Sequence, residues 1–360
     1  LEKRTTANTS SSFDITFQCY HVPNSTCEKA KRSFEKAAQI ISSVVLFKEP
    51  VRVNATLMSF CQMGSECNKG MMTLGGSSPT RSIPLINTDG LSRLHPQALV
   101  KQFDLSDHPS YFPYDIISVF NADAPFWFEE DDVAIKSNQA DFAFVILHEF
   151  MHGLGFFSGW NQYLSTGAIT PDPSPFLANQ FIMLVNPISN ALHTNQFVES
   201  AMDRLIHILF YDENNDITET RSLSSITKQL NRIQANNVTE LLESPDFYPA
   251  LEMNTISTEA YSLGVILPSE ENEVILLETG LKPFQPGSSI SHVAYEEYTH
   301  KQDFLMRYMQ DRGMTLDDAV KRGGGDGPIG PLLLRILEEI GYSTIKKPNN
   351  IPPLITNNAL

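Results

Sequence analysis

The chain has 360 residues, of which 41% are hydrophobic and 19% are charged, a composition typical of a folded globular protein. Its 42 acidic residues exceed its 26 basic residues and give a net charge of −16, which disfavours binding to nucleic-acid phosphates or to an anionic membrane surface. Apolar runs such as Phe142–Leu147 are far shorter than the roughly 20 residues of a membrane-spanning helix. We therefore expect an acidic protein with neither nucleic-acid nor membrane partners.

The first residues of the chain are polar and rich in Ser and Thr, so we expect residues 1–12 to be a flexible segment outside the fold. The chain begins Leu1-Glu2-Lys3-Arg4. The dibasic pair Lys3-Arg4 is typical of a processing site for a pro-protein convertase or of a remnant of a secretion leader. Both interpretations predict a secreted protein.

Four cysteines, all in the first fifth of the chain, are Cys19, Cys27, Cys61 and Cys67. Their even number, without the C-x-x-C spacing of zinc or redox sites, predicts two disulfides with three possible connectivities. We favour Cys19–Cys27 and Cys61–Cys67 because short loops close readily. Four N-x-S/T sequons, each weak evidence alone, lie at Asn8, Asn24, Asn54 and Asn237. Together with paired cysteines they predict a glycosylated, extracellular protein.

Several elements follow from periodicity in the first part of the chain. Apolar residues at three- and four-residue spacing predict a helix over 26–45, and alternation predicts a strand over 51–60. We expect a loop over 63–84, which is rich in Gly, Ser and Pro, and a second strand over 114–128 that breaks at a proline. The acidic cluster Glu129–Asp132 is interpreted as a solvated loop rather than a calcium site.

Residues 138–152 contain no Gly or Pro and predict a helix that Gly153 and Gly155 end. Within it His148-Glu149-Phe-Met-His152 forms an H-E-x-x-H motif. The four-residue interval places both imidazoles on one helical face, where they can bind one zinc ion. Glu149 lies beside them and is the predicted general base.

The alternative for this motif is a helix with two partly buried histidines that bind no metal. The turn before the motif, Phe142–Leu147, is wholly apolar. Burying two histidines and a carboxylate there without a metal would cost several kcal/mol. We therefore favour zinc.

The segment from His148 to Gly155 reads H-E-F-M-H-G-L-G and resembles the H-E-x-x-H-x-x-G opening of the metzincin metalloproteases. Where the short metzincin pattern has its third histidine, this chain has Ser158. Leishmanolysin-like metalloproteases have a long insertion before that histidine. The downstream segment Gly287-Ser-Ser-Ile-Ser-His292, followed by Asp303-Phe-Leu-Met306, is similar to their G-S-S-x-S-H and x-E-L-M motifs.

The resemblance implies that His292 is the third zinc ligand and that Met306 forms the Met-turn beneath the metal. Met306 lies fourteen residues after His292, a somewhat long gap, so Met309 is an alternative. The segment from Gly330 to Tyr342 resembles the helix that follows the Met-turn in such proteins.

The resemblance also implies an α/β (α+β) fold, with a twisted mixed sheet, an active-site helix and a C-terminal subdomain that holds the Met-turn. The corresponding boundaries are 13–155 for the N-terminal catalytic subdomain, 156–345 for the C-terminal subdomain with its insertion, and 346–360 for a tail.

Other third ligands remain open from the residues alone. Glu199 begins an E-x-x-x-D pattern that ends at Asp203 and that we place on a helix, the arrangement of thermolysin-like enzymes. That class does not require the turn at Gly155, and the pattern is common on solvated helix faces. His193 and His207 are further alternatives, each interpreted as an ordinary surface or core histidine.

The rest of the chain carries few chemical signals. Apolar spacing over 222–242 predicts an amphipathic helix. The glycines of 323–328 follow no strand and precede no Lys-Ser/Thr, which excludes a phosphate loop, and no G-x-S-x-G nucleophile motif occurs.

We therefore expect a secreted, monomeric zinc endopeptidase with protein or peptide substrates. Zinc would polarise water and the scissile carbonyl, and Tyr295 and Tyr298 are candidates to stabilise the oxyanion. The alternatives are a non-catalytic secreted zinc-binding protein and a zinc hydrolase of a non-peptide amide or ester.

Overall fold

The computed structural model describes residues 5–6, 12–62, 72–164, 166–173, 197–235, 237–268 and 273–354. The chain divides into two compact units, and each mixes α-helices with β-strands in several small sheets. Unit 1 takes residues 1–83, 95–156 and 298–359, and unit 2 takes residues 84–94 and 157–297. The expected α+β character is therefore confirmed.

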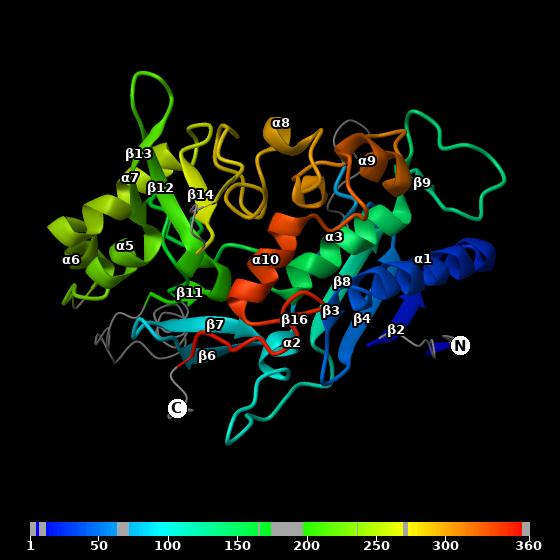
Figure 1. Cartoon of the computed structure of the whole chain (residues 1–360), viewed down its shortest axis with the longest axis horizontal. Coiled ribbons are helices and arrows are strands. Elements are labelled where there is room, and N and C mark those ends of the chain that lie inside the picture. The colour runs from blue at the N-terminus through cyan, green and yellow to red at the C-terminus, as the bar shows by residue number, and fades with distance from the viewer. Residues whose placement is uncertain are drawn as a thin grey trace. The chain divides into compact units, whose positions relative to one another are not determined.

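Unit 1 is built on a five-stranded sheet (Figure 1). The strands, in spatial order, are β1 (Thr5–Thr6), β2 (Phe13–Cys19), β4 (Val51–Met58), β8 (Ile116–Asn121) and β5 (Gly75–Pro79). The three central strands are parallel and the two outer strands are antiparallel to their neighbours, so the sheet is mixed, as predicted. Alternate residues of β4 are buried, which directs one face of the sheet toward the helices.

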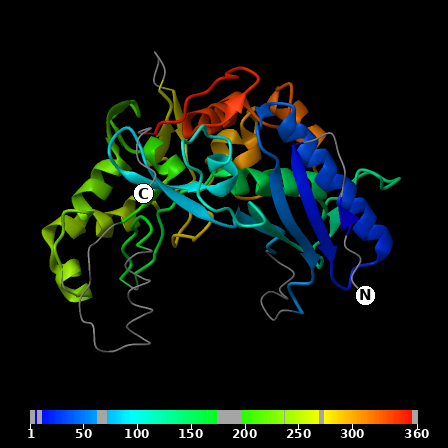
Figure 2. The ribbon, with the colours of Figure 1, turned by 90° about the horizontal axis from the view of Figure 1, so that it is seen from below.

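Two helices cover that face, and Figure 2 shows the blue helix α1 beside the blue strands. They are α1 (Asn24–Ser42), close to the predicted 26–45, and α3 (Phe142–Leu154). Phe34 of α1 is fully buried, and its ring lies 4.7–5.9 Å from four other aromatic rings: Phe17, Phe120, Phe142 and Phe150. These aromatic contacts fix α3, which carries the H-E-x-x-H motif, against α1 and the sheet.

The opposite side of α1 is basic and binds the acidic loop at 129–132. Lys29 pairs with Asp131, Arg32 with Glu130 at 2.6 Å, and Lys36 with Glu129 at 3.0 Å. The prediction of a merely solvated loop is thus incomplete, because cations spaced three and four residues apart along α1 neutralise it.

Helix α3 begins four residues later than predicted. Ala140–Asp141 form the short strand β10, which pairs in parallel with β9 (Phe126–Trp127). Asp141 then caps the helix by accepting hydrogen bonds from the backbone N–H groups of Ala143 and Phe144. Gly155 ends the helix with φ +115°, as predicted, whereas Gly153 lies inside it.

The chain returns to unit 1 after residue 297. It forms the short helix η3 (Phe304–Met306), α9 (Leu316–Gly323) and α10 (Pro331–Ile340), which confirms the helix expected after Gly330. The remaining elements are α2 (Gln97–Val100) and the pair β3 (Val45–Leu46) and β16 (Ser343–Thr344).

Unit 2 contains a four-stranded antiparallel sheet. In spatial order its strands are β13 (Ile217–Ser222), β12 (Ile206–Tyr211), β14 (Leu263–Ile266) and β15 (Val274–Leu276). Its helices are η1 (Ala201–Leu205), α5 (Leu223–Leu230), α6 (Val238–Glu243), η2 (Pro245–Phe247) and α7 (Tyr248–Ile256). A second sheet joins β11 (Glu199–Ser200), β7 (Ser92–Pro96) and β6 (Ser82–Ile86), and α8 (Tyr295–Tyr298) follows late in the chain.

Three sequence expectations are wrong. Residues 63–84 are not all loop, because β5 and β6 form there: their backbone groups pair although the sequence is rich in Gly, Ser and Pro. The helix expected over 222–242 is two helices, since the side chain of Asn237 accepts from the Glu240 N–H and starts α6 anew. Glu199 lies in a strand rather than on a helix, and only Asp203 lies in the short η1.

The Cys19–Cys27 disulfide is confirmed. Cys61 is also disulfide-bonded, and Cys67 lies outside the described residues. Among the sequons, Asn24 and Asn237 are exposed and Asn54 is partly exposed, while Asn8 lies outside the described residues. No helix within the described ranges is long and apolar enough to cross a membrane.

Candidate metal centre

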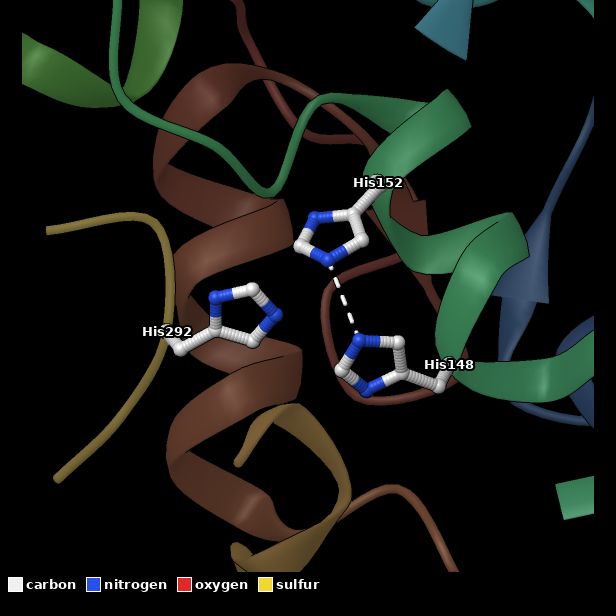
Figure 3. A group of neighbouring side chains, drawn as sticks. All are labelled: His148, His152 and His292. Carbon is white, nitrogen blue, oxygen red and sulfur yellow. Dashed lines mark hydrogen bonds between the residues drawn. The ribbon is translucent and has the colours of Figure 1, made fainter. Parts of the chain in front are cut away.

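Helix α3 places His148 and His152 side by side, as the four-residue spacing predicts. Their Nε2 atoms lie 3.1 Å apart and their ring centroids 4.8 Å apart (Figure 3). Both side chains are partly buried. The two imidazoles therefore point their outer nitrogens at one position beside the helix.

A backbone carbonyl fixes each of these rings through its other nitrogen. Nδ1 of His148 donates to the Leu305 carbonyl at 2.8 Å, and Nδ1 of His152 donates to the Phe156 carbonyl at 2.6 Å. A carbonyl can only accept, so both Nδ1 atoms carry a proton. In a neutral ring this leaves a lone pair at Nε2, the tautomer that metal-ligating histidines adopt.

The two Nε2 lone pairs consequently face each other at hydrogen-bonding distance. A proton on one of the two nitrogens or a metal ion shared by both can hold them at this distance. Desolvation lowers the pKa of His148 to about 4, and desolvation with the neighbouring His148 lowers the pKa of His152 to about 3. Both rings are thus neutral at pH 7, which favours a metal ion over a proton.

Glu149 is the buried carboxylate between the two histidines in sequence, and its side chain is 8% exposed. Desolvation raises its pKa to about 8, although a hydrogen bond from the backbone N–H of Ser77 in β5 acts to lower that pKa. A cation at the neighbouring imidazoles would lower this pKa again by direct attraction. A carboxyl group balanced in this way can accept and return a proton near neutral pH.

His292 is held in a loop of unit 2 and is 5% exposed. Its Nδ1 donates to the Ser288 carbonyl at 3.0 Å, which again leaves the lone pair of a neutral ring at Nε2. Ile290, two residues earlier, has φ +66°, a left-handed conformation that a β-branched residue seldom adopts. The loop therefore carries backbone strain next to the histidine, a feature common at functional sites.

Among the described residues, His148, His152 and His292 form a group that could hold a metal ion. The ligand atoms that they offer all lie within 4.8 Å of one another (Figure 3). Three imidazole nitrogens suit zinc, copper, iron or nickel better than calcium or magnesium, which prefer oxygen.

Met306 and Met309 differ sharply in environment. Met306 is fully buried in η3, directly after Leu305, whose carbonyl accepts the hydrogen bond from His148. Met309 is 41% exposed. Of the two, Met306 therefore has the surroundings expected of a core methionine.

The alternative ligands have other surroundings. Glu199 is fully buried and accepts hydrogen bonds from Arg93 Nε at 2.7 Å, Ser224 Oγ at 3.0 Å and Thr227 Oγ1 at 2.5 Å. Its charge is therefore already compensated by the guanidinium. His207 lies in β12 outside the histidine group, and His193 lies outside the described residues.

The carbonyls of Leu305, Phe156 and Ser288 and the N–H of Ser77 are parts of this site that sequence reasoning missed. Backbone groups leave no residue-type signal, because any residue supplies them. Of these groups, only the Phe156 carbonyl lies next to a sequence signal, because Phe156 directly follows the turn at Gly155.

Comparison with known proteins identifies the family of this chain. The model of the SPBPB7E8-like family matches residues 1–357, and the chain belongs to that family. It is 30% identical over 387 aligned residues to a Schizosaccharomyces pombe protein named "Uncharacterized protein PB7E8.01". That alignment covers 95% of this chain and 64% of the relative, so the chain spans less than two thirds of the relative's length. No solved structure matches.

Proposed function

We propose that the chain is a secreted zinc-dependent endopeptidase of metzincin type, similar to leishmanolysin. One observation carries the proposal. Two imidazoles on α3, oriented by backbone carbonyls, turn their Nε2 lone pairs toward each other at 3.1 Å, and the buried carboxylate of Glu149 lies at the adjacent helix position. This combination suits a catalytic metal with a proton acceptor beside it.

The residues fit a zinc ion. His148, His152 and His292 would hold it through Nε2, since each Nδ1 is engaged with a carbonyl. Three protein ligands leave the open fourth position that catalytic zinc sites keep. When bound there, zinc would lower the pKa of a coordinated water and polarise a carbonyl oxygen.

The chain itself would perform the proton transfers. Glu149 would accept the proton of the attacking water and deliver it to the leaving amine. The Ser77 N–H that donates to this carboxylate keeps it oriented and favours its ionised form. The carbonyls of Leu305 and Phe156 would hold His148 and His152 in the ligating tautomer throughout the cycle.

Strand β5 supports a peptide as the substrate. It is the last strand of the five-stranded sheet, paired with β8 on one side, and its alternate residues are exposed. An extended peptide can add to such an edge through backbone hydrogen bonds, and Ser77 links this strand to Glu149. This argument favours a peptidase over a hydrolase of other amides or esters.

Secretion is supported by the disulfide chemistry and the exposed sequons. Cys19 and Cys27 are joined, and Asn24 and Asn237 lie at the surface where glycans can be accommodated. A non-catalytic zinc protein would share the three histidines but would have no use for a buried carboxylate at position 149.

The proposal is tested by replacing Glu149 with Ala and measuring zinc content and casein cleavage on the same samples. We expect the variant to retain zinc and to lose about 10²–10⁴-fold in kcat, the usual contribution of a general base. Glu129→Ala is the control, because its carboxylate is exposed on the acidic loop. Near-native cleavage by Glu149→Ala would contradict the assignment.

A further inference from the structure

Ser158 occupies the position at which the short metzincin pattern has its third histidine. In this chain it makes three hydrogen bonds within unit 2, one of which its Oγ accepts from the Trp160 N–H at 3.1 Å. Its backbone N–H donates to Ser291 Oγ at 3.1 Å, and its own Oγ donates to Asp203 Oδ1 at 2.7 Å. Ser291 directly precedes His292. Ser158 therefore links the segment after α3 to the loop that carries His292.

Asp203 anchors this link. Its carboxylate is fully buried and also accepts from the Gly159 N–H at 2.9 Å and the Ser200 N–H at 2.7 Å. A Cβ on Gly159 would lie 3.0 Å from Asp203 Oδ2 and from Ser200 N, so a larger residue would require these groups to shift. Burying a carboxylate is costly, and these donors offset the cost while fixing its position.

Glu278 also holds this loop through hydrogen bonds. The Glu278 N–H donates to the His292 carbonyl at 2.8 Å, and its Oε2 accepts from the Tyr295 N–H at 3.0 Å. Two buried acidic residues thus hold the loop: Asp203 holds Ser291 through Ser158, and Glu278 holds His292 directly. A loop held at both residues can present one side chain in one orientation.

We propose that Asp203, Ser158 and Ser291 are positioning residues for His292. Ser158, at the position where the short metzincin pattern has a histidine, anchors the loop that carries His292. This inference rests on the proposed function, because His292 is there a zinc ligand. Outer partners of metal ligands typically contribute about 10–100-fold to metal affinity.

The test uses the full chain and Zn²⁺ alone, with affinity measured by competition against a chelator. Ser291→Ala removes the acceptor of the Ser158 N–H, and we expect its zinc affinity to fall about tenfold or more. Ser291→Thr keeps the hydroxyl and should restore most of the affinity. Ser158→Ala is the second variant, expected to lower affinity because it frees Asp203 from the link.

Ser289→Ala is the matched control. Ser289 is a buried serine of the same loop, but its hydroxyl accepts from the Gln285 N–H and not from Ser158. We expect its zinc affinity to match that of the wild type. An equal loss in Ser289→Ala and Ser291→Ala would overturn the proposal, since it would indicate general loosening of the loop.

A double-mutant cycle identifies the route of the effect. If Ser291 acts through His292, adding Ser291→Ala to His292→Ala should cause no further loss of zinc affinity. A full additional loss would overturn the proposal. Co²⁺ substitution gives a second readout: Ser291→Ala and His292→Ala should change the visible absorption spectrum in the same direction, and Ser289→Ala should leave it unchanged.

The two proposals fail in different ways. Zinc binding that depends on Ser291 and His292, without casein cleavage by the wild type, would overturn the peptidase and support the positioning role. Conversely, the wild type could cleave casein in a chelator-sensitive way while Ser291→Ala binds zinc as tightly as the wild type. That result would support the peptidase and overturn the positioning role.

Discussion

The three histidines proposed as zinc ligands are positioned by two different means. On α3, one helical turn brings His148 and His152 together, and carbonyls nearby orient their rings. His292 lies in an irregular loop, 140 residues after His152. Hydrogen bonds from Ser158 and Glu278, rather than helical geometry, hold this loop in place. The comparison teaches that sequence spacing can bring two histidines together on a helix, whereas a histidine in a loop is held by hydrogen bonds from residues far away in the sequence.

Removing a proposed ligand from either α3 or the loop gives the largest expected effect. His152→Ala and His292→Ala should each lower zinc affinity by more than about 100-fold, because even outer partners contribute about 10–100-fold. Zinc bound per chain after dialysis against a weak chelator measures this. His207→Ala is the control, since His207 lies outside the histidine group. Unchanged zinc binding by His292→Ala would break the comparison and leave the helix pair alone.

Gly155 forms the turn that ends α3. Its φ of +115° strains any other residue, and a Cβ there would lie 3.0 Å from Pro96 Cγ and 3.2 Å from Ile340 Cδ1. Gly155→Ala should therefore lower the free energy of unfolding by about 1–3 kcal/mol, measured by urea denaturation. Gly76→Ala, where a Cβ meets nothing within 4 Å, should change it by much less. Equal effects would show that the turn is not strained.

Asp141 fixes the other end of the same helix. Its carboxylate caps α3 and also accepts from the Leu316 N–H at 2.8 Å. Asp141→Ala should cost about 1–2 kcal/mol of stability, and Asp141→Asn, which keeps one acceptor, should cost less. The thermal midpoint measures both. If Asn destabilised as much as Ala, the buried charge rather than the cap would be the important feature.

The smallest effect is expected for the ion pairs of α1 with the acidic loop. Lys29 lowers the pKa of Asp131, although burial opposes it. A lowered pKa means that the stabilisation is present above the ordinary value near 3.8 and is lost as the pH falls through the lowered one. Lys29→Met should lose less than about 1 kcal/mol at pH 7, because ion pairs that remain partly open to solvent contribute little.

Urea denaturation of wild type and Lys29→Met at neutral and acidic pH measures this pair. The difference in stability between them should shrink as the pH falls. A difference that grew on acidification would contradict the charge pairing.

The sequence predicted the parts of the molecule that local periodicity determines. The spacing of Phe34, Ala37 and Ile41 predicts the buried face of α1, and alternation predicts β4. The interval from His148 to His152 predicts that the two imidazoles lie side by side, and Gly155 predicts the end of their helix. In each case the signal lies within one turn or one strand.

The remainder depends on partners far apart in the chain. Strand β5 forms from Gly-, Ser- and Pro-rich residues because β8 offers it a backbone edge, which no local pattern reveals. The E-x-x-x-D pattern made Glu199 a candidate metal ligand on a helix. In the structure it forms a buried ion pair with Arg93, which lies 106 residues earlier in the sequence. The patterns that contain Asp203 and Ser158 do not predict the hydrogen bonds of these residues, which form only when the loop of His292 lies beside them.

The central claim is that the histidine group holds a catalytic zinc ion. Its most direct test is zinc content by elemental analysis, with casein cleavage on the same sample before chelation, after chelation and after zinc is restored. The account predicts one zinc per chain and cleavage that disappears with the chelator and returns with zinc. A folded sample that binds no zinc, or that cleaves casein equally well without it, would contradict the account.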